Sequence, residues 1–194
     1  PWGFTRYYPL AGHPHPIPTL FLSGAGCAVR RQWLEQHGPA FDPSYRMYGE
    51  DRDLALRLAV QGYRLYTVPR AKLWHKHPNP LSNPKVGLRK ANLAARNGWR
   101  AYLKNMYLGE FLLFAPIILA GSFLRAWEFP APWWRRLAAG LGYFLLTLAY
   151  FLPALWFYLV LHPGERRQNL RRRTQPRGWL IKRLLTPPSK RTWS

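Results

Sequence analysis

One stretch of the sequence, Leu137 to Leu161, runs for 25 residues without a charged side chain. A helix of this length covers the ~30 Å hydrocarbon core of a bilayer with some tilt, so the stretch predicts a transmembrane helix. A second uncharged stretch, Phe111 to Leu124, has 14 residues and comes into range if it starts at Met106 and tolerates Glu110 near the interface. Whether this second stretch spans the membrane or re-enters it stays open. Residues 106–161 thus predict two membrane helices arranged as a hairpin.

The charges lie on both sides of this apolar segment. The formal net charge is +21: residues 1–104 hold 16 Lys and Arg against 5 acids, residues 105–161 hold 3 against 2, and residues 162–194 hold 10 against 1. Basic flanks around a nearly neutral middle are typical of a membrane segment whose two ends share the anionic, cytoplasmic side. We therefore expect a cytoplasmic-membrane protein with a polybasic cytoplasmic tail over residues 162–194 that contacts anionic lipids.

Nucleic acid is the rival explanation for so much positive charge. Against it, the basic residues accompany no recognisable RNA- or DNA-binding motif, and 25 consecutive uncharged residues have no role in such a protein. We predict no nucleic-acid partner. Residues 85–105 fit the membrane interpretation, because they predict a basic helix at the lipid surface, with Lys90, Arg96, Arg100 and Lys104 among Ala, Leu, Trp and Tyr.

Residues 1–84 predict a mixed α/β unit. Short apolar stretches at Thr19–Leu22 and Ala25–Val29 are compatible with strands around a Ser23-Gly24 turn, and Tyr63–Val68 alternates like a strand before Pro69. Two helices are expected between them, Arg31–Gln36 and Asp51–Gln61, the second ended by Gly62.

Four of the eight acids, Asp42, Glu50, Asp51 and Asp53, fall within twelve residues of a strongly basic half. One interpretation is structural, because acids in the first turn of a helix are favoured by about 0.3 to 1 kcal/mol each. The other is chemical, because a carboxylate at a helix start can act as a general base on a hydroxyl or help to bind a metal-diphosphate.

The order of motifs around these acids resembles that of the inverting family-2 glycosyltransferases over about residues 20–105. The matching pieces are Ser23-Gly24-Ala25-Gly26, Phe41-Asp42, Gly49-Glu50-Asp51-Arg52-Asp53-Leu54, Gly62-Tyr63, Val68-Pro69, Ala71 and His75. Each piece is weak alone, and the spaced set is specific. The resemblance implies the acceptor-side portion of a GT-A-type α/β domain and the inverting transfer of a sugar from a nucleotide-sugar donor to a lipid-linked or envelope glycan acceptor.

Specific roles follow from the resemblance. Asp51 matches the base that deprotonates the acceptor hydroxyl, and Glu50 shapes its environment. Asp53, which points to another side of the helix, is assigned to acceptor contacts or to capping. Gly24 and Ala25 are expected to contact the acceptor.

A divalent cation, Mn or Mg, is the implied cofactor. His75 matches the histidine that completes the metal site on the donor diphosphate, and His77 is a possible substitute. The nucleotide-binding half that the family places earlier in its chain, with its Asp-x-Asp metal motif, is not found in this sequence. We therefore expect the isolated chain to be inactive and a longer parent enzyme to carry the activity; the alternative is a non-catalytic membrane-anchoring module derived from such an enzyme.

The expected organisation has four parts. Residues 1–84 form a partial catalytic domain, residues 85–105 an interfacial helix, residues 106–161 two membrane helices, and residues 162–194 the polybasic tail. The catalytic part and the tail are expected on the cytoplasmic face. The single cysteine, Cys27, excludes an internal disulfide.

Overall fold

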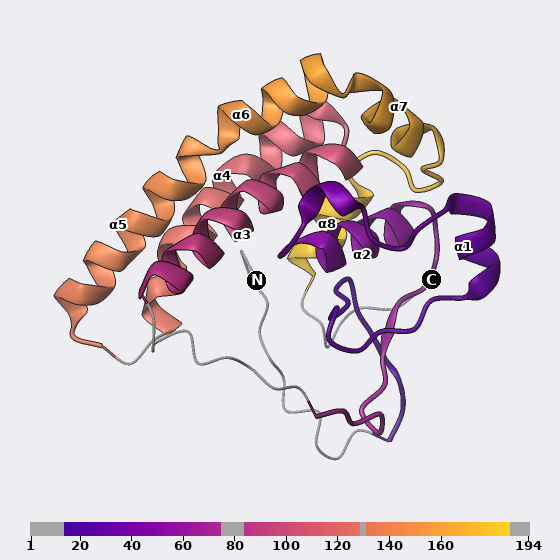
Figure 1. The fold of residues 1–194 in the computed structure, drawn as a ribbon, viewed down its shortest axis with the longest axis horizontal. Helices are drawn as coiled ribbons and strands as arrows, with labels where there is room; N and C mark the ends of the chain where they lie inside the picture. Colours follow the sequence, from indigo (N-terminus) through magenta and orange to yellow (C-terminus); the bar gives the residue numbers. More distant parts are fainter. Residues whose placement is uncertain (1–13, 75–83, 129–130, 187–194) are drawn as a thin grey trace.

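The computed structural model describes residues 14–74, 84–128 and 131–186, and it is mostly helical (Figure 1). Long helices form a layer along one side, and the shorter N-terminal elements and loops lie against it (Figure 1).

The N-terminal elements are helix α1 (Arg31–His37), the 3₁₀ turn η1 (Pro43–Tyr45) and helix α2 (Glu50–Val60). Both helices were predicted within a residue or two of these bounds. The strands are much shorter than predicted. In the part of the chain that the structure describes, sheet pairing is limited to two antiparallel strands of two residues each, β1 (Ile17–Pro18) and β2 (Tyr66–Thr67).

The expected α/β domain is therefore not confirmed by the described residues. Of the predicted strands, Thr19–Leu22 and Ala25–Val29 adopt irregular structure, and Tyr63–Val68 keeps only its β2 pair. An apolar stretch becomes a strand only when another strand satisfies its backbone groups, and β1 pairs with β2 alone. The stretch before the glycine turn instead packs Leu20 into the helical core.

Helix α3 (Pro84–Asn105) runs through the centre of the molecule and packs against α2 on one side and the later helices on the other. Its predicted extent is confirmed, but its surface position is not. Arg100 and Lys104, two of the four basic residues expected to face lipid, are only 5% and 7% exposed because they bind the N-terminal part. Trp99 anchors the opposite face, making edge contacts with Phe111 and Phe151.

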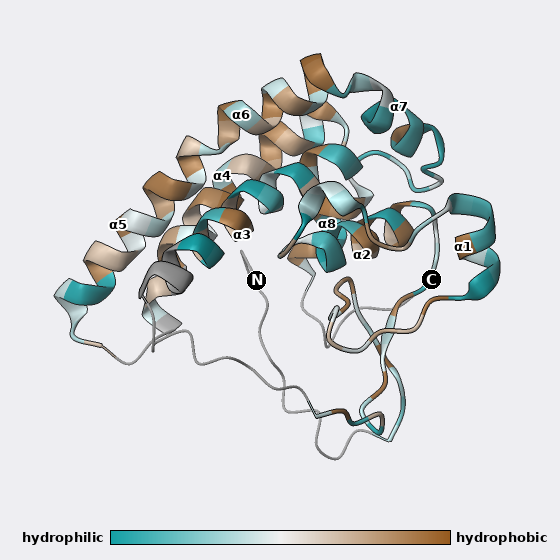
Figure 2. Ribbon diagram, in the orientation of Figure 1, coloured by the Kyte–Doolittle hydropathy of each residue, from teal (hydrophilic) through white to brown (hydrophobic). Residues whose placement is uncertain are grey.

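The apolar segment forms α4 (Leu108–Leu124), η3 (Arg125–Glu128), α5 (Trp133–Ala149), α6 (Phe151–Trp156) and the π-helical turn η4 (Phe157–Leu161). Helices α4 and α5 pack against each other. By length and composition, Trp133–Leu161 is able to cross a membrane, and α4 is shorter. Figure 2 shows apolar residues concentrated along these helices. A hairpin with two crossings is not confirmed.

The C-terminal part folds back onto the rest of the chain through α7 (Pro163–Arg171) and α8 (Trp179–Leu185). Arg173 makes an ion pair with Glu110 at the start of α4, with Nη1 2.6 Å and Nη2 2.8 Å from its oxygens. The backbone N–H groups of Thr174 and Gln175 donate to the carbonyl of Val60 at the end of α2. Residues 172–185 are thus part of the folded unit, with Leu180 and Leu184 of α8 in the core.

Candidate active site at the start of helix α2

Helix α2 begins at a glycine that both its conformation and its packing require. Gly49 is the N-cap with φ 98°, a left-handed conformation that favours glycine. A Cβ atom at Gly49 would lie 2.9 Å from the Cβ of Asn97 on α3. The close approach of the two helices brings Glu50 and Asp51, the first two residues of α2, to a fixed position.

The glycine turn meets this helix start. The backbone N–H of Gly24 donates to Oδ2 of Asp51 over 3.3 Å, and Oδ1 of Asp51 accepts from the N–H of Arg52 at 2.7 Å. A Cβ atom added to Gly24 would lie within 4 Å of both Asp51 and Glu50. The structure therefore brings together four predicted site residues, since Gly24 and the adjacent Ala25 form an exposed turn beside the two carboxylates.

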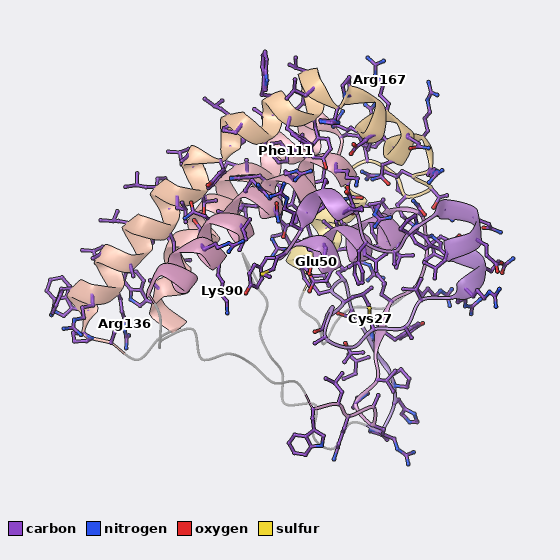
Figure 3. The ribbon with its side chains drawn as sticks, viewed as in Figure 1. Cys27, Glu50, Lys90, Phe111, Arg136 and Arg167 are labelled. Atoms are coloured by element: carbon purple, nitrogen blue, oxygen red, sulfur yellow. The ribbon has the colours of Figure 1, made fainter. Side chains whose placement is uncertain are left out.

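Cys27 directly follows the glycine turn, three residues after Gly24 (Figure 3). It is exposed, and burial of its thiol first and the negative charge of Asp51 second raise its pKa. Glu50 contributes a second carboxylate whose Oε2 is buried without a hydrogen-bond partner in the described part of the chain.

The loop before α2 is strained and is held from α3. Arg46 and Tyr48 have φ of 60° and 62°, which is uncommon for residues with side chains. The side-chain amide of Asn97 donates to the carbonyls of Tyr45, Met47 and Tyr48 at 3.0, 3.0 and 2.6 Å. One buried amide therefore fixes the four residues that lead into Gly49.

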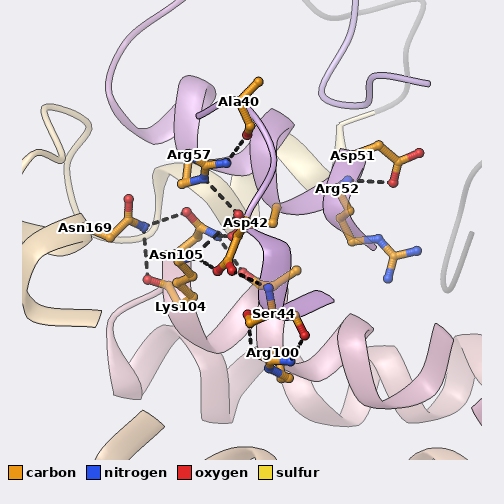
Figure 4. Close-up of polar contacts among 12 residues, drawn as sticks. Ala40, Asp42, Ser44, Asp51, Arg52, Arg57, Arg100, Lys104, Asn105 and Asn169 are labelled. Carbon is orange, nitrogen blue, oxygen red and sulfur yellow. Dashed lines mark hydrogen bonds and ion pairs between the residues drawn. The ribbon is translucent and has the colours of Figure 1, made fainter. Parts of the chain in front are cut away.

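Two cations further along α3 hold the beginning of the same loop (Figure 4). Arg100 donates to the carbonyl and hydroxyl oxygens of Ser44, and Lys104 lies 2.7 Å from Oδ2 of Asp42. Burial opposes ionisation of Asp42, but hydrogen bonds from Lys104 and Ser44 outweigh it and lower its pKa to about 2. Residues 97, 100 and 104 share one helix face, which positions the loop along its whole length.

Asp53 lies in this buried network. Its side chain is fully buried, with Oδ2 2.8 Å from Nε of Arg57 and 3.5 Å from Lys104, and Oδ1 3.1 Å from Nδ2 of Asn105. Arg57 thus pairs with an acid of its own helix, four residues earlier. The structure gives no support to the acceptor contact assigned to Asp53, because both of its oxygens accept from protein donors and its side chain is fully buried. Its side chain does not cap the start of α2 either, since the α2 N-cap has no side-chain hydrogen bond.

The predicted metal ligand His75 and its substitute His77 lie outside the described residues. The described chain does come close to the glycine turn just before them: a Cβ atom on Gly26 would lie 1.9 Å from Cδ2 of Leu73, so Leu73 packs directly over that glycine. Among the described residues no group of three or more His, Cys, Asp or Glu gathers as a metal site. Glu50 and Asp51 are the adjacent carboxylates there that could serve as oxygen ligands.

Sequence reasoning missed the part that α3 plays in this site. The sequence analysis places Arg100 and Lys104 on a basic helix at the lipid surface and does not single out Asn97, although the three- and four-residue spacing of these residues is that of one helix face. The spacing alone does not say whether such a face meets lipid, water or protein. Only the contacts with residues 42–48 decide it.

Comparison with known protein families is consistent with this arrangement. The family model described as glycosyl transferase family group 2 matches residues 13–163, which include the glycine turn, both carboxylates, α3 and the whole apolar segment. The chain belongs to this family, and its activity is therefore that of a sugar transferase. Searches of curated proteins and of solved structures found no match to the chain.

Proposed function

We propose that this protein contributes the acceptor-activating half of an inverting glycosyltransferase, with Asp51 as the general base. The observation that carries the proposal is the half-buried Asp51 carboxylate, oriented by the N–H groups of Gly24 and Arg52 at the start of α2. Each Asp51 oxygen accepts one such bond from the protein and keeps further acceptor capacity for a substrate hydroxyl.

The reaction is a single displacement. The acceptor hydroxyl loses its proton to Asp51 as its oxygen bonds to the anomeric carbon, and the bond from that carbon to the nucleotide diphosphate breaks on the opposite face. Glu50, one of whose carboxylate oxygens is buried without a donor among the described residues, places a second carboxylate beside Asp51. The family supports a nucleotide-sugar donor and a glycan acceptor. We propose that the donor carries a hexose or deoxyhexose and that the acceptor is lipid-linked or part of the cell envelope.

A membrane location supports such an acceptor. Trp133–Leu161 exposes a row of large apolar side chains, among them Leu141, Leu145, Leu152 and Trp156. We propose that this face meets lipid in the cytoplasmic membrane, with basic residues of α7 near anionic headgroups. An alkaline carbonate wash tests this arrangement, because it strips proteins that adhere by charge and leaves those with an apolar segment in the bilayer.

We also propose a divalent cation, Mn or Mg, for the donor diphosphate. When bound, it would offset the charge that develops on the leaving group. His75 is the candidate ligand from this chain by resemblance, and Glu50, beside Asp51, is a candidate carboxylate ligand. In the full-length enzyme, His75→Ala should raise the Mn concentration for half-maximal rate, and His77→Ala should leave it unchanged. An unchanged metal requirement in His75→Ala would remove His75 from the site.

The test of the proposed function is transfer by the full-length protein in native membranes, with a panel of labelled nucleotide sugars and NMR assignment of the anomeric product. Asp51→Asn should lower the rate by about 10²- to 10⁴-fold, because an amide cannot take up the proton. Glu35→Gln, at an exposed acid on α1, is the matched control and should keep the wild-type rate. Turnover of Asp51→Asn within tenfold of wild type would exclude Asp51 as the base. Absence of any transfer would favour the anchoring module.

A further inference from the structure

Arg52 is a buried cation of helix α2 that the proposed reaction does not use. Its side chain is 8% exposed, and its Nη1 is buried without a hydrogen-bond partner. The nearest recorded contact of the guanidinium is the ring of Tyr102, whose centroid lies 5.7 Å away. A buried N–H group that lacks a partner costs about 1 to 3 kcal/mol and more when the group is charged, so its presence calls for an explanation.

Other buried or half-buried cations of this half have anionic or carbonyl partners. Arg57 pairs with Asp53, Lys104 pairs with Asp42, and Arg100 binds Ser44 and lies 4.8 Å from the centroid of the Tyr45 ring. Arg100 and Arg96 each leave one nitrogen buried without a partner, but each makes at least one side-chain hydrogen bond; within the described residues, the Arg52 guanidinium makes no hydrogen bond or ion pair. The protein keeps an arginine at this position although nothing in the described chain balances its charge.

The position of Arg52 indicates which kind of group could neutralise its positive charge. Arg52 follows Asp51 directly, and Figure 4 shows both side chains leaving α2 on the side away from the cluster of Asp42, Lys104 and Asn105. Lys90 of α3 lies 5.9 Å from the ring centroid of Tyr48, in the loop that leads into α2.

The two carboxylates at the start of α2 would hinder binding of an anionic substrate unless a cation lies beside them. Glu50 and Asp51 place two carboxylates beside the glycine turn, and a phosphate that approached them would be repelled. A guanidinium next to the base offsets that repulsion, and its planar fork fits two phosphate oxygens at once.

We propose that Arg52 is a substrate-binding residue that holds a phosphate group next to Asp51. The proposal rests on the proposed glycosyl transfer and goes beyond it by assigning a phosphate contact to this chain. Two sources share the chemistry: the diphosphate of the nucleotide-sugar donor and the phosphate of a lipid-linked acceptor.

The test measures phosphate binding by the full-length protein in detergent, by titration calorimetry with inorganic pyrophosphate, and in parallel its binding to neutral phosphatidylcholine vesicles with and without a polyprenyl phosphate. Three variants are compared. Arg52→Met removes the charge and keeps the length of the side chain, Arg52→Lys keeps the charge without the fork, and Arg64→Met is the control at an exposed arginine in the same half.

Arg52→Met should weaken binding of one of the two probes by about tenfold or more, Arg52→Lys should weaken it less, and Arg64→Met should leave it unchanged. Loss with pyrophosphate assigns Arg52 to the donor diphosphate, and loss with polyprenyl phosphate vesicles assigns it to the acceptor. Unchanged affinity for both probes in Arg52→Met would overturn the proposal.

Thermal unfolding without ligand separates binding from a structural role. A residue that is buried without a partner should cost stability, so the melting temperature of Arg52→Met should equal or exceed that of wild type. A lower melting temperature with unchanged binding would assign Arg52 to its contact with Tyr102 instead.

The sugar-transfer assay distinguishes a failure of the proposed function from a failure of the phosphate contact of Arg52. If transfer is absent but Arg52→Met still loses phosphate binding, the proposed function fails and the phosphate contact stands. If transfer occurs and Arg52→Met keeps both its KM values, for donor and for acceptor, the proposed function stands and the phosphate contact fails.

Discussion

The two sides of helix α2 use the same kind of residue in opposite ways. On the side of the glycine turn, Asp51 is half-buried and takes hydrogen bonds from two backbone N–H groups. On the side of α3, Asp53 is fully buried and takes its bonds from Arg57, Lys104 and Asn105. Two carboxylates that are two residues apart thus differ in what reaches them: Asp51 is open to a substrate, and Asp53 is enclosed by cations.

This difference shows that acids clustered in a sequence do not have to belong to the same site in the structure. The α3 side fixes the loop and the helix that carry the α2 start, and the α2 start has the open carboxylates. If this division is correct, substitutions on the α3 side should mainly lower stability, and substitutions at the start of α2 should mainly lower turnover.

The largest effect on stability is expected for Asp53→Asn. The variant leaves Arg57 and Lys104 buried with one charge fewer between them, and breaking a buried ion pair in this way costs about 3 to 5 kcal/mol. Urea unfolding followed by fluorescence measures the loss. Asp51→Asn is the matched control, because its carboxylate is bonded only to backbone N–H groups. Equal destabilisation by the two variants would contradict the division.

A smaller effect on stability is expected for Asn97→Ala. Asn97 lies on α3 and binds the loop that leads into the start of α2, so it connects the two sides. The variant leaves the carbonyls of Tyr45, Met47 and Tyr48 without their shared donor. We expect a loss of about 1 to 3 kcal/mol in unfolding free energy and a fall in kcat, because the strained loop then no longer fixes the start of α2.

A second α3 variant, on another side of the helix, is the control for Asn97→Ala. Asn92→Ala replaces an amide of the same helix that accepts a hydrogen bond from Tyr150, away from the loop. It should lower stability without changing kcat in the folded fraction. A fall in kcat as large as that of Asn97→Ala would show that general loosening, rather than loop position, limits turnover.

The smallest effect is a pH dependence that belongs to the α3 side. The pKa of Asp42 lies at about 2 in the folded chain, below its ordinary value of 3.8. A carboxylate with a depressed folded pKa stabilises the protein above its unfolded pKa, and this contribution is lost as the pH falls from about 4 toward 2. Its size is about 1 kcal/mol: each pKa unit corresponds to about 1.4 kcal/mol, and solvent screening reduces the contribution of this partly exposed ion pair.

Unfolding free energies measured between pH 2 and pH 5 for wild type and Asp42→Asn test this expectation. The variant should be less stable than wild type at pH 5, and the difference between the two should shrink toward pH 2. A constant difference across this range would mean that the bond from Lys104 does not depend on ionised Asp42.

Much of the helical structure followed from the sequence because its causes are local. The bounds of α1, α2 and α3 follow from apolar periodicity and from turn residues such as Gly38 and Gly62, which act within one helical turn. The strands could not be predicted in the same way, since a strand depends on a distant partner. Only Ile17–Pro18 and Tyr66–Thr67, nearly fifty residues apart, find each other among the described residues.

The sequence by itself determined where the chain is apolar, where α1, α2 and α3 begin and end, and that the acids gather around Gly49. Only the tertiary structure decided that Asp53 is enclosed, that Arg100 and Lys104 serve the loop, and that Arg173 pairs with Glu110. The physical reason is distance along the chain. The contacts of Lys104 with Asp42 and of Arg173 with Glu110 join residues 62 and 63 positions apart, and packing alone brings such residues within hydrogen-bond range.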